Sequence, residues 1–413
     1  MLKNTLSLIL SKTIAHSPIR FASWFKVTNE QEIHHGYAYT SGLNKLKGLF
    51  DKNGSCVPGG LYFTNKRHIH KFYGYGVNLR VVKLPKFDSD FKMVRDPTGD
   101  KWRANKIILG PKYSLSDPDT YKKLKIDIYP DWIINEASAQ GDVDTLDKWA
   151  SSGLPLKYSE EAIDRASANG KVDVLNWWSK SKLPMKYTNR AINDASIGCK
   201  IEALDWWLNS KLPMKYSDSA IDIASSYGQI DVLDWWYNSS KAGLPLKYSS
   251  GALNNASCNG RIDVLDWWLK SGLKMKYTFS ILYITSCNGQ IDVLDWWLKS
   301  GLKLKYRNDA VDGASYHGNI STLNWWLKSG LKLKYSKDAI DNGSYYNRPG
   351  VLEWWLKSGL PLKYSETAIN NAYKRNHIDT LKWWKTSGLK IKYPSNLIGN
   401  IDQLIATLDN RRT

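Results

Sequence analysis

Hydrophobic positions in the last two thirds of the chain follow a pattern that recurs at a fixed distance. Within residues 158–186, Ala162, Ile163 and Ala166 have the spacing of a short helix with small residues on one side. Residues 172–178 are apolar over a wide arc, as expected of a second helix that is buried on two sides. The pattern predicts a helix–turn–helix unit followed by a short loop.

Capping and turn residues mark where these helices begin and end. Ser159 is a suitable N-cap for the first helix, and Gly170 follows its last turn. A glycine ends the second helix in most units, but Lys182 and Lys211 stand at that position in two of them. We expect these two lysines to be strained by up to about 1 kcal/mol if they adopt the left-handed conformation.

A Lys-Tyr pair sets the period of the units. It occurs nine times from residue 157 onward, and eight of these pairs follow a Trp-Trp pair. Successive tyrosines lie 29 residues apart, except for one gap of 32. The tyrosines are Tyr158, Tyr187, Tyr216, Tyr248, Tyr277, Tyr306, Tyr335, Tyr364 and Tyr393. Such a period is typical of stacked repeats that bury their apolar faces against their neighbours. We therefore expect nine repeats at 129–392 and a capping half-repeat at 393–413.

The paired tryptophans are expected to lie in the interior rather than to form a stacking platform for a ligand. Adjacent helical residues point about 100° apart, so one pair cannot present a single flat face. We expect one ring to face the first helix of its own repeat and the other to face the next repeat. The small residues Ala166 and Ser167 and their equivalents leave room for them.

The segment that starts at residue 162, AIDRASANGKVDVLNWWSKSKL, resembles the ankyrin pattern. In that pattern Thr-Pro-Leu-His-x-Ala-Ala leads through Gly-His to Ile-Val-x-x-Leu-Leu. Here Asp164 stands at the His, and Trp177-Trp178 stand at Leu-Leu. The period is 29 rather than 33 residues, so we expect the projecting β-turn finger to be reduced to a tight loop.

Long runs of near-identical repeats behind a distinct N-terminal domain are similar to the ankyrin-repeat proteins of giant viruses of the mimivirus type. The resemblance implies a mostly α fold, an ankyrin-like α-solenoid of short 29-residue repeats after a small α/β domain. It also implies a non-enzymatic protein–protein interaction scaffold that binds a host or viral protein partner in the cytoplasm of the host cell.

Positions at which the repeats differ are the candidate partner contacts. The residue before the Ala-Ser pair varies, and Tyr283 replaces the Asp or Asn of the other repeats. Several aromatic residues precede or enter the turn between the two helices, and tyrosine is enriched in binding hot spots. The candidates are Arg165, Asp194, Tyr227, Tyr283, Tyr316, His317, Tyr345 and Tyr346. The alternative is sequence drift on a solvent-exposed face. We also expect Arg348-Pro349-Gly350 to break the start of a second helix.

The lysine before each repeat tyrosine offers an alternative function. These lysines, among them Lys276 and Lys305, are expected to align as a basic ladder that could follow a nucleic-acid backbone. Each repeat also carries acidic residues, such as Asp263 and Asp266. A solvated edge is therefore favoured over a nucleic-acid groove.

Residues 24–125 do not repeat, and their short apolar runs predict a small mixed α/β domain. His35-Gly36, followed by Gly59-Gly60-Leu61-Tyr62-Phe63, resembles the layout of ADP-ribosyltransferases. In that family the His and the Tyr hold a nicotinamide cofactor, and a Glu on a later strand completes the site. Asn105 stands in the Glu position and cannot act as a carboxylate, so the resemblance implies an inactive or altered nucleotide site at His35, Tyr62 and Asn105. We expect no catalytic residue, no metal and no bound cofactor.

The chain carries 58 Lys and Arg against 39 Asp and Glu, a net charge of +19. Residues 1–128 hold 22 of the basic residues and 10 of the acidic ones, so the region before the repeats is the more basic. Residues 1–23 contain no acid and suit a mitochondrial presequence, although an unstructured extension is favoured. The four cysteines, Cys56, Cys199, Cys258 and Cys287, lack metal-ligand spacing and are expected to be free thiols. No apolar run reaches the length of a membrane span.

Overall fold

A computed structural model of the chain describes residues 24–53, 59–127, 129–395 and 400–410. The chain divides into two compact units, residues 1–188 and 189–413, and each is described by itself. The extension at 1–23, for which a targeting role was considered, lies outside the described residues. Cys56 also lies outside them, whereas Cys199, Cys258 and Cys287 are free thiols.

The first unit begins with a seven-stranded sheet whose strand order is β4-β9-β6-β1-β5-β8-β7. Every pairing between these strands is antiparallel. The strands are β1 (Trp24–Thr28), β4 (Gly42–Lys45), β5 (Leu61–Asn65), β6 (Asn78–Lys83), β7 (Met93–Arg95), β8 (Trp102–Ala104) and β9 (Lys106–Ser114). A separate hairpin consists of β2 (Ile33–His34) and β3 (Tyr37–Ala38), and a 3₁₀ helix, η1, spans Ile69–Tyr75. The short apolar runs at 61–63 and 77–84 fall in β5 and β6.

Strand β1 lies in the middle of the sheet, between β5 and β6. Residues Phe25 to Thr28 are buried without alternation, because the strand is covered on both faces. Leu61, Phe63 and Ile107 form part of the core on one face. This position of β1 places the side chain of Lys26 inside the domain.

Helix α1 (Pro118–Leu124) connects the sheet to the repeats. Asp117 caps it, since its carboxylate accepts a hydrogen bond from the Asp119 N–H, and Pro118 occupies the first helical position. The ring of Tyr121 packs against that of Trp149, with 5.4 Å between centroids. The Trp149 indole also donates to the Ser116 carbonyl at 2.7 Å. Helix α1 therefore supplies the first repeat with contacts that a preceding repeat supplies elsewhere.

The remaining described residues form nine helix pairs and one last helix. In the first unit these pairs are α2 (Trp132–Gln140) with α3 (Val143–Ser151) and α4 (Glu161–Ala168) with α5 (Val172–Lys180). In the second unit they are α6 (Arg190–Ile197) with α7 (Ile201–Asn209), α8 (Ser219–Tyr227) with α9 (Ile230–Lys241), α10 (Gly251–Cys258) with α11 (Ile262–Lys270), α12 (Ser280–Asn288) with α13 (Ile291–Lys299), α14 (Asp309–His317) with α15 (Ile320–Lys328), α16 (Asp338–Tyr345) with α17 (Pro349–Lys357), and α18 (Thr367–Lys374) with α19 (Ile378–Thr386). The last helix is α20 (Ile401–Asp409).

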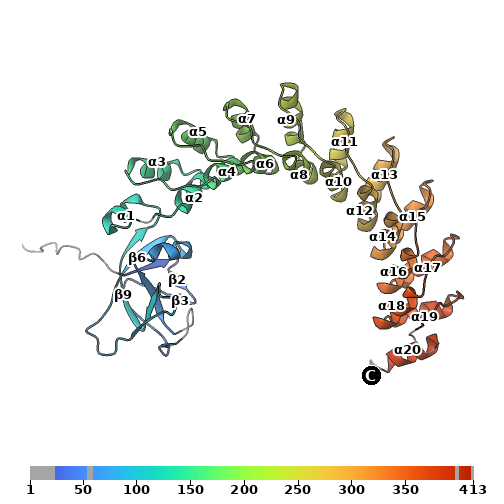
Figure 1. The fold of residues 1–413 in the computed structure, drawn as a ribbon, viewed down its shortest axis with the longest axis horizontal. Coiled ribbons are helices and arrows are strands. Elements are labelled where there is room, and N and C mark those ends of the chain that lie inside the picture. The colour runs from blue at the N-terminus through green and yellow to red at the C-terminus, as the bar shows by residue number, and fades with distance from the viewer. Residues whose placement is uncertain (1–23, 54–58, 128, 396–399, 411–413) are drawn as a thin grey trace, which may run out of the picture. The chain divides into compact units, whose positions relative to one another are not determined.

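Within the second unit, the first helices of successive pairs pack side by side, as α8, α10 and α12 do, while the second helices form another row (Figure 1). The predicted fold, a helical repeat solenoid after a small region of strands, is confirmed. Helix α20 packs against α19 and begins with a capping box, in which Asn400 and Gln403 exchange hydrogen bonds. Residues 396–399 and 411–413 of the predicted capping half-repeat lie outside the described residues.

The turn geometry agrees with the sequence in most places and departs from it in two. Lys182 and Lys211 both have φ of 60°, the left-handed conformation that was expected to strain them. Ser159 is not the N-cap of α4, which is Glu160, but its hydroxyl accepts from the Glu161 N–H at 3.3 Å. Pro349 does not break α17: it is the first residue of a helix of nine residues, where proline has no hydrogen bond to lose.

The second tryptophan of each pair lies fully buried in the interior of the array. Trp297, for example, is 1% exposed, and its indole donates to Ser257 Oγ of the preceding repeat at 2.9 Å. The first tryptophan is half-buried in most repeats, and the Trp296 indole donates to the Asp266 carboxylate at 2.7 Å. The predicted core role is confirmed, but the expected orientation is wrong. Both indole nitrogens reach back to the preceding repeat, because Ser and Asp side chains there supply the acceptors.

Buried polar side chains on the first helices also join successive repeats. The Asp341 carboxylate accepts from the Ser365 N–H at 2.9 Å and from the Ser365 hydroxyl at 2.5 Å. Burial raises the pKa of Asp341, and the two hydrogen bonds from Ser365 oppose that effect. Where Asn stands in this column, its amide makes the equivalent contacts, as Asn193 does with Ser217 at 2.8 Å and 3.1 Å.

Candidate functional site

The lysines of the ladder contact the repeat tyrosines that precede them along the array. Lys276 donates to the Tyr248 carbonyl at 2.7 Å, and its ammonium group lies 4.1 Å from the centre of the Tyr248 ring. The Tyr248 hydroxyl in turn donates to the Lys274 carbonyl at 3.1 Å. The same arrangement recurs for Lys247, Lys305, Lys334, Lys363 and Lys392. The Lys-Tyr pair is therefore a connection between repeats, which accounts for its recurrence without a nucleic-acid ligand.

One junction in the second unit is built differently, at the repeat that carries Tyr283. Arg307 stands where the neighbouring repeats have Thr278 and Ser336, and its guanidinium lies 3.6 Å from the centre of the Phe279 ring. Gly313 faces Tyr283 and Cys287: a Cβ there would lie 2.6 Å from Cys287 Sγ and 3.0 Å from a Tyr283 ring carbon. The three departures, at Tyr283, Arg307 and Gly313, compensate for one another, so Tyr283 can lie partly exposed at 38%.

Tyr316, Tyr345, Tyr346 and Arg375 form a contiguous group over α14, α16 and α18, and Tyr283 lies on the adjacent helix α12. We call these five residues the tyrosine cluster. Tyr346 donates to the Tyr316 hydroxyl at 2.7 Å, and the two ring centroids lie 4.2 Å apart. The Tyr345 and Tyr346 ring centroids lie 4.5 Å apart. The Arg375 guanidinium lies 3.7 Å from the centre of the Tyr345 ring and also hydrogen-bonds to its hydroxyl.

The tyrosine cluster replaces simpler contacts at the same positions of other repeats. Asn259 donates to Ser226, and Asn288 donates to Cys258, from positions equivalent to those of Tyr346 and Arg375. The late repeats therefore use larger side chains than this junction needs. Tyr316, Tyr345 and Tyr346 remain partly exposed, and Arg375 is exposed. His317, whose ring lies 4.7 Å from that of Tyr316, is exposed beside them.

The other predicted contact residues lie on first helices away from the tyrosine cluster. Arg165 on α4 forms an ion pair with Glu136 on α2 at 2.9 Å. Asp194 pairs with Arg190 one turn earlier on α6 at 3.3 Å. Tyr227, the last residue of α8, is 59% exposed. Arg375 was not predicted, although a basic residue in the aromatic column was visible in the sequence.

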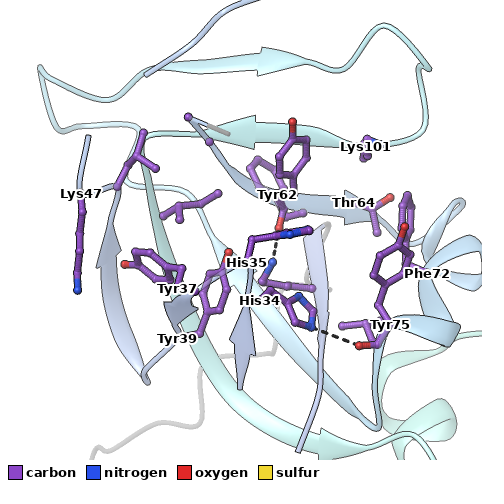
Figure 2. Close-up of a pocket in the computed structure, with 18 of the residues that line it drawn as sticks. His34, His35, Tyr37, Tyr39, Lys47, Tyr62, Thr64, Phe72, Tyr75 and Lys101 are labelled. Carbon is purple, nitrogen blue, oxygen red and sulfur yellow. Dashed lines mark hydrogen bonds between the residues drawn. The ribbon is translucent and has the colours of Figure 1, made fainter. Parts of the chain in front are cut away.

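A cavity of about 860 Å³ opens in the sheet domain. His35 and Tyr62 both line it, as Figure 2 shows, together with His34, Tyr37 and Tyr39. Asn105 is not among the described residues that line it. Its side chain accepts from the Lys92 N–H and donates to the Asp90 carbonyl, so it holds a loop instead. The structure brings together two of the three residues that were suggested by the ADP-ribosyltransferase resemblance.

The hairpin of β2 and β3 presents the two histidines to this cavity. His34 pairs with Tyr37 in the strand register, which leaves His35 and Gly36 as a two-residue turn. Both have positive φ, 49° and 75°, as a tight turn of this kind requires. His34 Nε2 lies 3.3 Å from the Tyr75 carbonyl (Figure 2). Burial lowers the pKa of His34, and the nearby charge of Lys26 lowers it further.

Lys26 also lines the cavity, although it was not among the site residues predicted from the sequence. It is 6% exposed, and its ammonium group donates to the Tyr62 carbonyl at 3.0 Å and lies 4.2 Å from the centre of the Tyr39 ring. Burial lowers the pKa of Lys26 to about 7. A signal was present in the sequence, since a lysine within the apolar run Trp24-Phe25-Lys26-Val27 is unusual for a buried strand.

In the described part of the chain, no cluster of three or more His, Cys, Asp or Glu residues could hold a metal ion. None of the helices in the same residues combines the length and the apolar character of a membrane span.

The chain is similar in sequence to several proteins of Acanthamoeba polyphaga mimivirus. A putative ankyrin repeat protein is 46% identical over 123 residues, which are 29% of this chain and 61% of that protein. An uncharacterized protein is 50% identical over 101 residues, 24% of this chain and 72% of that protein. Another putative ankyrin repeat protein is 41% identical over 101 residues, 24% of this chain and 30% of its own length. The chain thus spans less than two thirds of the first and third of these relatives.

No protein-family model matches the chain. Among solved structures, the crystal structure of the human ASB11 ankyrin repeat domain aligns with 46% of this chain and 96% of its own, at 13% identity and a TM-score of 0.35. The viral relatives and the repeated helix pairs agree with the resemblance found in the sequence. The chain belongs to the ankyrin-repeat proteins of giant viruses of the mimivirus type.

Proposed function

We propose that the repeat array is a non-catalytic scaffold that binds a protein partner through the exposed face of its first helices, with the tyrosine cluster at the centre of the contact. The observation that supports this proposal is that recurring positions and variable positions of the repeats make different contacts. The recurring Trp, Asp, Ser, Lys and Tyr side chains bond to neighbouring repeats, whereas the cluster departs from the recurring pattern and is partly exposed.

The chemistry of the tyrosine cluster suits a protein interface. Tyr and Arg dominate binding hot spots because each offers a large contact area together with hydrogen-bonding groups. Contacts between Tyr316, Tyr345 and Tyr346 also hold the rings in place before binding. The side chains of the cluster would therefore lose less conformational entropy when a partner binds than mobile side chains would. His317 and Tyr227 are proposed as peripheral contacts.

The lysine ladder supports nucleic-acid binding less well. Its ammonium groups lie against tyrosine rings and carbonyl oxygens, so following a phosphate backbone would require them to leave those sites. If the ladder were a nucleic-acid site, the affinity for duplex DNA or RNA would fall steeply with salt concentration. We expect only weak binding and a shallow salt dependence.

Photo-crosslinking tests the proposed surface. The full chain would carry p-benzoylphenylalanine in place of Tyr345, or in place of the exposed Lys328 on the second helix α15 as the control. After irradiation in Acanthamoeba lysate, we expect defined protein adducts from position 345 and only background from position 328. Equal labelling from both positions, or labelling from position 328 alone, would contradict the proposal.

Substitution gives a second measurement on the same surface. We expect the double variant Tyr345→Ala, Arg375→Ala to weaken capture of the crosslinked partner about tenfold or more, because each hot-spot truncation costs about 2 kcal/mol or more. Tyr227→Ala, which lies outside the cluster, should weaken capture less. A matching thermal unfolding profile would show that the double variant acts on binding.

A further inference from the structure

The cavity of the sheet domain has an unusual lining. It is walled by aromatic rings, among them Phe25, Tyr37, Tyr39, Tyr62 and Phe72. Lysines and histidines join them, and none of the described lining residues is an Asp or Glu. Its volume of about 860 Å³ lies in the range of about 300–1,000 Å³ that is usual for small-molecule sites. The lining combines flat apolar surfaces with basic side chains, of which Lys101 lies 4.0 Å from the Asp96 carboxylate outside the lining.

Lys26 is the buried lysine of this lining, at 6% exposed. Among the described residues, no carboxylate lies within ion-pair distance of it, and its ammonium contacts a carbonyl oxygen and a ring face. A buried cation without an anionic partner is costly. A methionine would fill the same strand position without that cost, so the lysine needs an explanation beyond packing.

We propose that this cavity binds a small molecule that has a planar aromatic ring and an anionic group, with the ring against the tyrosines and the anion at the Lys26 ammonium. The anion is a carboxylate or a phosphate, and both provide the oxygen acceptors that an ammonium group requires. The inference concerns the sheet domain and is independent of the protein-binding surface proposed for the repeats.

The aromatic wall is arranged to receive a ring. The Tyr37 and Tyr39 rings lie 4.7 Å apart by their centroids, and the Tyr37 hydroxyl is held by the Lys45 carbonyl at 2.9 Å. The Tyr62 hydroxyl accepts from Arg103, which is fully buried behind it, at 3.1 Å. Figure 2 shows the rings of Tyr37, Tyr39 and Tyr62 around the same space as His35. Fixed rings of this kind bind a planar ligand with little loss of side-chain entropy.

The charges around Lys26 favour an anion from several directions. The Lys101 ammonium lies 5.6 Å from the centre of the Tyr62 ring. Lys47 adds a positive charge from the loop after β4, and His34 and His35 bring hydrogen-bonding imidazole rings to the cavity from the hairpin. An anion beside Lys26 would raise the pKa of that amine from its value of about 7 in the empty cavity. Binding should therefore take up a proton near neutral pH.

Isothermal titration calorimetry on the full chain tests the proposal with two matched pairs of probes. AMP and indole-3-acetate are the aromatic phosphate and the aromatic carboxylate, and adenosine and indole-3-acetamide are their uncharged counterparts. We expect at least one of the two anions to bind at least about tenfold more tightly than its uncharged counterpart, because a charge-assisted hydrogen bond is lost in the counterpart. The preferred pair identifies the anionic group.

Two lysine variants separate ligand binding from folding. Lys26→Met should weaken binding of the preferred anion by about 10- to 100-fold while the melting temperature of the chain stays the same or rises. Lys83→Met is the control, because Lys83 is an exposed lysine on the adjacent strand β6. It should change neither quantity.

The outcomes are distinct. Tighter binding of an anion than of its counterpart, lost in Lys26→Met, supports the site. Failure of both anions to bind, equal affinity of an anion and its counterpart, or unchanged affinity in Lys26→Met would overturn it. A fall in the melting temperature of Lys26→Met with unchanged anion affinity would assign the lysine a purely structural role.

Discussion

The buried polar groups that join the repeats and the buried Lys26 of the sheet domain differ in the partners that they have. In the repeats, the recurring buried Asp and indole N–H groups meet partners from the neighbouring repeat, as Asp341 and Trp297 do. In the sheet domain, Lys26 is equally buried and has no anionic partner among the described residues. Buried polar groups therefore join successive repeats in the array, whereas the buried Lys26 marks the ligand site that we propose in the sheet domain.

The difference has a physical basis in symmetry. A repeat that stacks on its own copy can satisfy a buried donor with the same acceptor each time, so one solution serves the whole array. The sheet domain has no second copy to supply that partner. A charge that stays buried there without a partner reduces stability, and such costs are typically retained at functional sites.

The largest effect should come from removing the interior tryptophan of one repeat. Trp297→Ala removes a ring that is 1% exposed and leaves Ser257 without its donor, which should destabilise the array by about 3–5 kcal/mol. Urea unfolding followed by far-UV circular dichroism measures the loss. Trp296→Ala, at the half-buried partner position, is the control and should cost clearly less. Equal losses at both positions would contradict the distinction between interior and half-buried rings.

A smaller effect is expected at the buried link between first helices. Asp341→Ala leaves the Ser365 N–H and hydroxyl without their acceptor and should cost about 1–3 kcal/mol in urea unfolding. Asp341→Asn should cost less than about 1 kcal/mol, because asparagine makes these contacts elsewhere in the array, as Asn193 does. A large loss in Asp341→Asn would mean that the charge itself matters to the junction.

The same pair of variants predicts a pH dependence. Because the pKa of Asp341 is raised in the folded state, the folded chain binds the proton more tightly than the unfolded chain. This contribution to stability is fully present below the unfolded pKa and is lost as the pH rises through the folded pKa. Asp341→Asn should remove it, which urea unfolding between pH 4 and pH 7 measures as a shallower pH dependence in the variant.

At Lys26 we expect the opposite sign, a gain in stability on substitution. Lys26→Met should stabilise the unliganded sheet domain by about 1–2 kcal/mol, because it removes an unpaired buried cation. The pKa of about 7 lies below that of an unfolded lysine, so wild-type stability should rise with pH from about 7 toward 10, where the folded state no longer holds the proton. Hydrogen exchange of the β1 amides, corrected for intrinsic rates, would show this slope in the wild type and its absence in Lys26→Met.

The smallest effect is predicted for one step of the lysine ladder. Lys276→Ala removes a hydrogen bond to the Tyr248 carbonyl and a contact with its ring, and should cost about 0.5–1 kcal/mol in urea unfolding. Lys299→Ala, at an exposed ion pair with Asp295, is a control that should cost less. If Lys276→Ala did not alter stability but lowered the affinity for duplex nucleic acid, the ladder would be a binding surface after all.

Much of the array is predictable from the sequence, because its helices and core depend on local, periodic spacing. The recurrence of the Lys-Tyr and Trp-Trp pairs predicted helix pairs, their core and the strained turns at Lys182 and Lys211. It did not predict that both indole nitrogens reach back to the preceding repeat, since hydrophobic periodicity does not specify hydrogen-bond acceptors. The proline at position 349 was taken as a helix breaker because its position within the first turn depends on where the preceding loop ends.

The amino-acid sequence by itself determined the repeat, its length and the side chains that fill its interior, because those depend on short-range spacing. Only the tertiary structure brought Lys26, Tyr39 and Tyr62 to one cavity and separated Asn105 from it. Those residues come from distant segments of an antiparallel sheet, and strand order is set by long-range pairing that no local pattern encodes.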